Sequence, residues 1–102
     1  MGLDVSLEDE AGRVLGAVGD PLNILHRVLP GPDASEYCYL GLIDWYGNTV
    51  INRVQAARFL SEWKQLEMTA IDAAAVGLLV AIRQLAERLD ETPHLYLWFR
   101  GD

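Results

Sequence analysis

The sequence has little of what disulfide, metal and membrane chemistry require. Cys38 is the only cysteine among the 102 residues, so no internal disulfide can form. The two histidines, His26 and His94, have no second histidine or cysteine at metal-ligand spacing, which leaves a zinc site without a basis. The most apolar stretch, residues 73–82, is about half of the ~20 residues that a membrane crossing needs. We therefore expect no cofactor, no metal and no membrane partner.

Recognisable catalytic motifs are also missing. The chain has no glycine-rich phosphate loop, no nucleophile elbow and no HExxH arrangement. Cys38 lies between two tyrosines in an apolar segment, where we expect it to be buried and inert. We expect a protein that is not an enzyme, although scattered carboxylates such as Glu36 and Asp44 could still meet in the fold. The start lacks the basic segment and apolar run of a signal peptide, and we expect a cytoplasmic protein.

Basic residues are scarce in the first half of the chain. The net charge is −7, and residues 1–52 hold eight acidic side chains against two arginines, a net charge of −6. Such a half repels phosphate backbones and attracts basic protein surfaces, so we expect no nucleic-acid partner. A high net charge also keeps proteins in solution without any partner, and that alternative stays open.

What is present predicts one α+β domain over residues 1–102. Hydrophobic residues make up 51% and charged residues 23%, the usage of a folded domain. Alternation over 3–8, a turn with Gly12 and a return over 13–18 predict a β-hairpin. Further strands are expected over 37–43, 49–51 and 94–99, with 37–43 interior to the sheet because it is apolar on both sides.

Three helices are expected between these strands. Asp20 is predicted to cap the first, with Pro21 at its first helical position. Asn52 and Gln55 resemble a capping box, and the helix they open should place one apolar face at Val54, Ala57, Leu60, Trp63 and Leu66. Thr69 and Asp72 suggest the cap of a third helix, which we expect to be covered on more than one side, with Gly77 permitting close packing. The predicted order is β-β-α-β-β-α-α-β, a mostly antiparallel sheet packed against helices.

Aromatic residues suggest a contact surface on this sheet. If the leucines of 37–43 and 94–99 face the helices, then Tyr37, Tyr39, Tyr96 and Trp98 point to the opposite side. Three alternatives stay open for this side of the sheet: the first helix covers it, it forms a homodimer interface, or it binds another partner.

The loop 44–48 is the second candidate contact site. Trp45 and Tyr46 could form an exposed anchor beside Asp44 and Asn48. Alternatively, one ring folds back over the sheet edge while Asp44 and Asn48 bind turn amides.

No motif resembles a family closely enough to assign one. We expect a small intracellular protein-binding module that docks a basic partner through acidic and aromatic surfaces, for example as an immunity protein or antitoxin does. The alternatives are a small-molecule-binding protein or enzyme with a pocket between sheet and helices, containing His94 or Asp44, and a structural homodimer.

Overall fold

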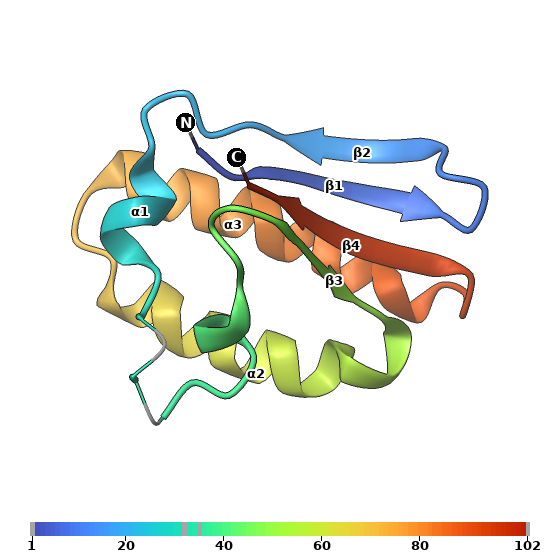
Figure 1. Ribbon diagram of the computed structural model, residues 1–102. Helices are drawn as coiled ribbons and strands as arrows, with labels where there is room; N and C mark the ends of the chain where they lie inside the picture. Colours follow the sequence, from blue (N-terminus) through green and yellow to red (C-terminus); the bar gives the residue numbers. More distant parts are fainter. Residues whose placement is uncertain (1, 32, 35, 102) are drawn as a thin grey trace.

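The chain folds around one four-stranded antiparallel sheet. A computed structural model describes residues 2–31, 33–34 and 36–101. The strands lie in the order β2-β1-β4-β3, so that the last strand of the chain pairs with the first (Figure 1). This arrangement confirms the predicted α+β class. The strands are β1 (Asp4–Asp9), β2 (Val14–Val18), β3 (Asn48–Ile51) and β4 (Leu95–Arg100).

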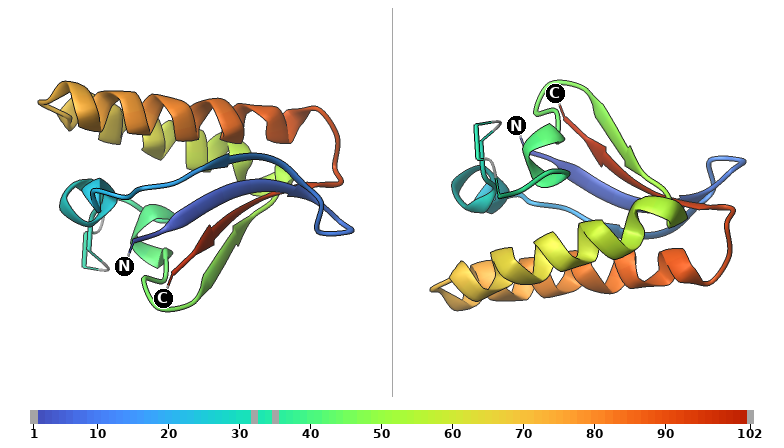
Figure 2. Two further views of the ribbon diagram at one scale, coloured as in Figure 1. Left: turned by 90° about the horizontal axis from the view of Figure 1, so that it is seen from above. Right: turned by 90° about the horizontal axis from the view of Figure 1, so that it is seen from below.

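The two long helices cover one face of the sheet. In Figure 1, α3 (Ala73–Glu87) lies behind the strands and α2 (Arg53–Thr69) lies below β3, and Figure 2 shows both helices on the same side of the sheet. The short helix α1 (Ile24–Val28) lies beside one end of the sheet. Two 3-10 helices, Leu40–Leu42 and Arg88–Asp90, complete the described helical structure.

None of the helices in the described ranges is long and apolar enough to span a membrane.

The β1–β2 hairpin forms as its sequence predicts. Alternation places Leu3, Val5 and Leu7 in the core. Gly12 has a φ of +84°, a conformation that suits glycine because it has no Cβ. The Asp9 carboxylate accepts hydrogen bonds from the amides of Ala11 (3.0 Å) and Arg13 (2.9 Å), which closes the turn.

Helices α2 and α3 begin at the predicted caps. Asn52 and Gln55 form the reciprocal capping box, and the Asp72 carboxylate accepts from the amide of Ala75 at 2.8 Å. The predicted face of α2 was partly wrong, because Val54 and Ala57 are exposed. The buried face of α2 consists of Ala56, Phe59, Glu62, Trp63 and Leu66.

The covering of α3 also differs from the prediction. Val76 is 41% exposed and Gly77 faces open space, so α3 is buried along one side and Gly77 provides no close packing. Close approach occurs at Gly16 instead, where a Cβ would lie 2.7 Å from Leu85 Cδ2. A side chain at that position of the edge strand would require the Leu85 side chain to move.

The first helix begins later than predicted. Asn23 rather than the predicted Asp20 occupies the N-cap position, although the Asp20 carboxylate oxygens do accept from the amides of Ile24 and Leu25 at 2.8 Å each. Pro21 is not helical, because residues 21 and 22 form a turn before α1.

The predicted interior strand over 37–43 was wrong. These residues form turns and the 3-10 helix, and Cys38 is exposed rather than buried.

Candidate functional site

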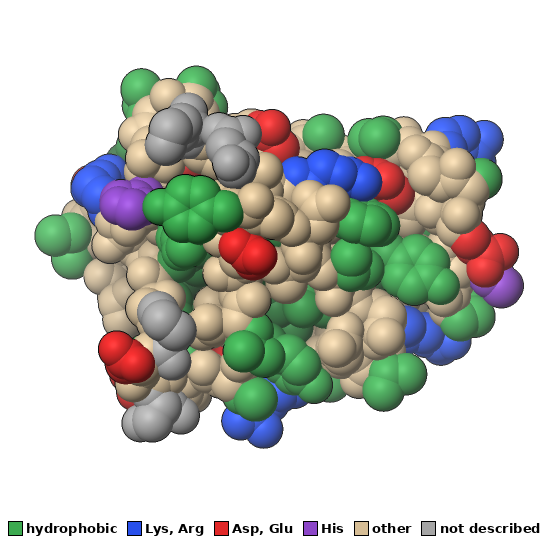
Figure 3. Space-filling model, in the orientation of Figure 1, with side chains coloured by type: hydrophobic (Ala, Val, Ile, Leu, Met, Phe, Trp, Pro, Cys, Tyr) green, Lys and Arg blue, Asp and Glu red, His purple; other side chains and the backbone are tan. Residues whose placement is uncertain are grey.

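The face of the sheet opposite the two long helices is the candidate functional site. Along β4, Leu95, Leu97 and Phe99 are buried against the helices, while Tyr96 and Trp98 point to the other side and are half-buried. No helix of the described residues crosses the strands on that side (Figure 1). Hydrophobic side chains are exposed there over β4 (Figure 3). We call this surface the open face.

The tyrosines predicted to share the open face lie elsewhere. Tyr37 and Tyr39 belong to the segment between α1 and the 3-10 helix Leu40–Leu42, where both are half-buried against the core. Of the four aromatic residues predicted to point to this side, the structure places Tyr96 and Trp98 together on the sheet. Val50 of the neighbouring strand β3 joins them, with Val50 directly opposite Trp98.

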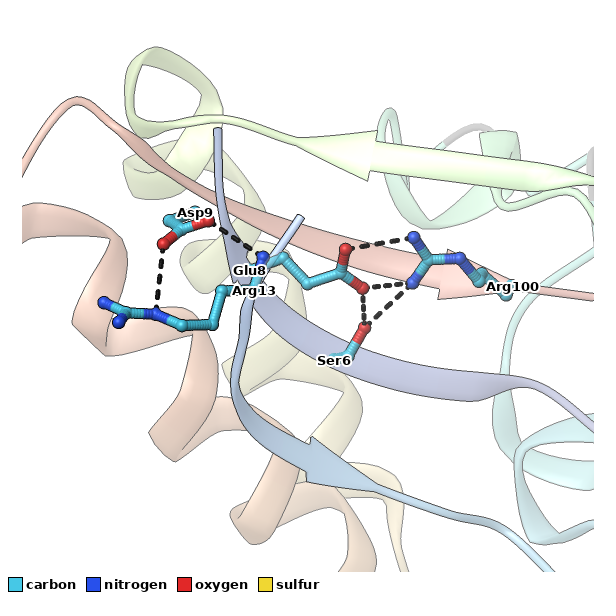
Figure 4. Close-up of polar contacts among 5 residues, drawn as sticks. All are labelled: Ser6, Glu8, Asp9, Arg13 and Arg100. Atoms are coloured by element: carbon cyan, nitrogen blue, oxygen red, sulfur yellow. Dashed lines mark hydrogen bonds and ion pairs between the residues drawn. The ribbon is translucent and has the colours of Figure 1, made fainter. Parts of the chain in front are cut away.

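A polar network lies flat on the open face. The Ser6 hydroxyl donates to Glu8 Oε2 at 2.6 Å, and Arg100 donates to Ser6 Oγ at 3.0 Å and to Glu8 Oε1 at 3.1 Å (Figure 4). Arg100 Nη1 also contacts Glu8 Oε2, so the ion pair is bidentate. The Glu8 side chain is 5% exposed and that of Arg100 is 39% exposed. The network therefore satisfies a buried carboxylate on a side of the sheet without helices.

Arg100 also joins this network to the aromatic residues. Its guanidinium carbon lies 4.3 Å from the centroid of the Trp98 ring, a cation–π contact. Hydrogen bonding from Arg100 holds the pKa of Glu8 below its ordinary value, although burial acts in the opposite direction. The same hydrogen bonding raises the pKa of Arg100. The alternation of residues indicated that Trp98 lies here, whereas Glu8 and Arg100 are far apart in sequence and gave no such signal.

We expect Glu8→Gln to lower the free energy of unfolding by about 1–3 kcal/mol at about pH 7, because Arg100 loses its charged acceptor. The folded-state pKa of Glu8 is depressed, so the carboxylate's contribution is complete above its unfolded-state pKa. That contribution disappears as the pH falls through the folded-state value. Urea denaturation of both proteins should show a difference that shrinks as the pH falls below the ordinary pKa of a glutamate.

Asp33→Asn is the control for this measurement, since it removes an exposed carboxylate outside the network. Its effect should stay within about 0.5 kcal/mol. A difference between wild type and Glu8→Gln that is the same at every pH would contradict the ion pair.

A shallow hollow of about 350 Å³ lies on the open face. Tyr96 and Trp98 of β4 and Val50 of β3 supply its apolar lining. The hairpin supplies the rest, through Glu8, Asp9, Glu10 and Gly12. Glu10 and His94 are both exposed, and their side chains pair at 2.9 Å between Oε2 and Nδ1.

The loop 44–48 presents one free aromatic ring rather than two. Tyr46 is 80% exposed, whereas Trp45 is half-buried against the core and its ring meets that of His26 edge-on at 5.2 Å. Asp44 Oδ1 accepts from the amide of Tyr46, as in the predicted alternative in which the loop binds its own amides. Gly101 packs so closely on this loop that a Cβ there would overlap the Trp45 carbonyl.

Fewer acidic side chains of residues 1–52 are free to contact a partner than the sequence suggests. Glu8 is paired with Arg100, Asp9 closes the hairpin turn, and Asp20 accepts from amides of α1. The other five acids of residues 1–52 are exposed: Asp4, Glu10, Asp33, Glu36 and Asp44. Of these, Glu10 lines the hollow. Negative charge is therefore present beside the aromatic residues, although the Glu8 carboxylate is already paired within the protein.

No family model, curated protein or solved structure matches the chain.

The geometry alone therefore indicates what the site can do. Within the described ranges, no three histidine, cysteine or acidic side chains come together to hold a metal ion. His94 and Asp44 are both exposed, so neither lies in an interior pocket. An open surface with half-buried rings and a satisfied polar network is suited to contact with a macromolecule.

Proposed function

We propose that this chain is a protein-binding module that docks a partner on the open face. The observation that carries the proposal is the position of Tyr96 and Trp98, half-buried on a sheet face that none of the described helices covers. Tyrosine and tryptophan supply large contact areas with few rotatable bonds, and tryptophan and tyrosine are enriched among residues that dominate binding energy.

The polar groups around these rings favour a protein as the partner. Interfaces between proteins combine an apolar centre with a polar rim. On the open face, Trp98 and Val50 are flanked by the Glu8–Arg100 pair, whose hydrogen bonds are made within the chain. The one arginine of this network is already paired with a carboxylate, so the face offers a phosphate backbone little attraction.

The open face is the stronger candidate of the two aromatic surfaces. It combines two rings and Val50 around a hollow, while the loop 44–48 presents Tyr46 without a second free ring. A protein that blocks a basic toxin by occupying it, as immunity proteins and antitoxins do, is one concrete form of this function. Tyr46 would then lie outside the main contact.

Photo-cross-linking in the native host tests the proposal. Benzoylphenylalanine in place of Tyr96 should cross-link a protein partner, whereas the same probe in place of Gln65, exposed on α2, should not. Trp98→Ala added to the Tyr96 probe should lower the cross-linked fraction by about tenfold or more, the effect of losing a hot-spot aromatic.

The controls show which surface binds the partner and whether the partner is a second copy of the chain. Tyr46→Ala added to the Tyr96 probe should leave the cross-link unchanged. Equal cross-linking from positions 65 and 96 would overturn the proposal. Cross-links solely to a second copy of the chain would also overturn it, since the open face would then be a homodimer interface.

A further inference from the structure

Carboxylates supply the charged side chains that line the hollow on the open face. Three carboxylates line it, those of Glu8, Asp9 and Glu10, and no lysine or arginine side chain does. Glu8 is committed to Arg100, and Asp9 accepts hydrogen bonds from the hairpin amides. The Glu10 side chain is 62% exposed and contacts the exposed ring of His94. Glu10 is therefore the carboxylate of the hollow that can best receive a new cation.

The protein already contains a cation bound in this manner. The Arg100 guanidinium lies over the Trp98 ring and is held from the side by the Glu8 carboxylate. An aromatic ring and a carboxylate acting on one guanidinium combine cation–π attraction with charge-assisted hydrogen bonds. Tyr96 and Glu10 bring the same two groups to the hollow. In the sheet register, Tyr96 lies opposite Glu8, two residues before Glu10.

The size of the hollow limits what can enter it. Its volume of about 350 Å³ is at the lower end of the range for small-molecule sites, about 300–1,000 Å³. It is open on one side, so a side chain reaching in from a partner's surface fits it better than an enclosed ligand does. The adjoining face remains available for the rest of that partner.

We infer that the hollow is a subsite for a basic side chain of the partner, an arginine or a lysine that lies against Tyr96 and pairs with Glu10. This inference rests on the proposed function, because the side chain belongs to a protein docked on the open face. The charge of the whole chain, −7, favours the approach of such a basic segment.

Titration with two short peptides tests the subsite without knowledge of the partner. The probes are acetyl-Gly-Arg-Gly-Arg-Gly-amide and the same peptide with neutral citrulline in place of arginine. Saturable changes in the NMR signals of Glu10, Tyr96 and the Trp98 indole are expected for the arginine peptide. The citrulline peptide should bind about tenfold more weakly, since it lacks the charge for the cation–π contact and the ion pair.

Two charge-removing variants provide the matched comparison. Glu10→Gln should weaken binding of the arginine peptide by about three- to fivefold, the effect of one exposed ion pair. Asp33→Asn should leave it unchanged, because the segment after α1 lies at the opposite end of the molecule from the hairpin (Figure 1). Tyr96→Ala should abolish the signal change at Glu10.

The outcomes separate this inference from the proposed function. Equal binding of the two peptides, signal changes away from the hollow, or equal effects of Glu10→Gln and Asp33→Asn would each overturn the basic subsite. Cross-linking from position 96 together with such a result would leave the open face as a docking surface that recognises an uncharged group. Peptide binding at the hollow without any cross-linked partner would instead overturn the protein-binding function.

Discussion

Trp63→Ala is expected to lower the free energy of unfolding by about 3–5 kcal/mol, the range for removing a large buried aromatic side chain. Trp63, a residue of α2, is fully buried. Its ring stacks on Phe59 at a centroid distance of 5.3 Å and lies 6.2 Å from Phe99. The indole Nε1 also donates to the Leu79 carbonyl at 2.8 Å, which ties α2 to α3.

Chemical denaturation of three variants would check this expectation. Trp63→Phe keeps an aromatic ring but loses volume and the indole hydrogen bond, and should cost less than the alanine variant. Val54→Ala is the matched control on the same helix. Val54 is 91% exposed, so its truncation should change the free energy of unfolding by less than about 0.5 kcal/mol. A cost for Val54→Ala similar to that of a buried valine would contradict the observed orientation of α2.

The buried face of α2 differs from the face that its sequence predicts. The predicted apolar face ran through Val54, Ala57 and Leu60 to Trp63, whereas the buried side includes Phe59 and Glu62. Phe59 contacts both Trp63 and Phe99, and Phe99 belongs to a strand 40 residues later in the chain. The side of a helix that is buried is the side that meets neighbouring elements. Those neighbours are set by the tertiary fold rather than by the helix's own sequence.

Local signals predicted the fold well where a few adjacent residues decide the conformation. The hairpin turn at Gly12, the capping box at Asn52 and the cap at Asp72 all depend on contacts within four residues. The alternation along β4 likewise predicted which side Tyr96 and Trp98 face. The Glu8–Arg100 pair could not be predicted, because its partners are 92 residues apart and meet through the pairing of β1 with β4.

The predicted strand over 37–43 was wrong because a contact distant in sequence decides the conformation of this segment. Its apolar residues suit an interior strand as well as a 3-10 turn packed on the core. What distinguishes the two is the Glu62 carboxylate, which accepts from the amides of Tyr39 at 2.8 Å and Leu40 at 3.2 Å. These amides begin the 3-10 helix Leu40–Leu42, so a side chain of α2 caps a turn more than 20 residues earlier.

Glu62→Ala is accordingly expected to lower the free energy of unfolding by about 2–4 kcal/mol, because two backbone amides lose a charged acceptor inside the protein. Glu62 is 3% exposed, and water cannot replace its oxygens without opening the segment. Hydrogen exchange should become faster at the amides of Tyr39 and Leu40. Exchange in the β1–β2 hairpin should change only as much as the global stability does.

Two variants separate the cap from the charge of Glu62. Glu62→Gln keeps an oxygen that can accept from Tyr39 and Leu40, and should protect these amides better than alanine does. Arg58→Ala removes the arginine that pairs with Glu62 Oε2 at 3.0 Å. Because Arg58 is 63% exposed, its loss should cost no more than about 1 kcal/mol and should leave both amides protected. If Glu62→Ala left their exchange unchanged relative to the hairpin, the 3-10 turn would owe its position to apolar packing instead.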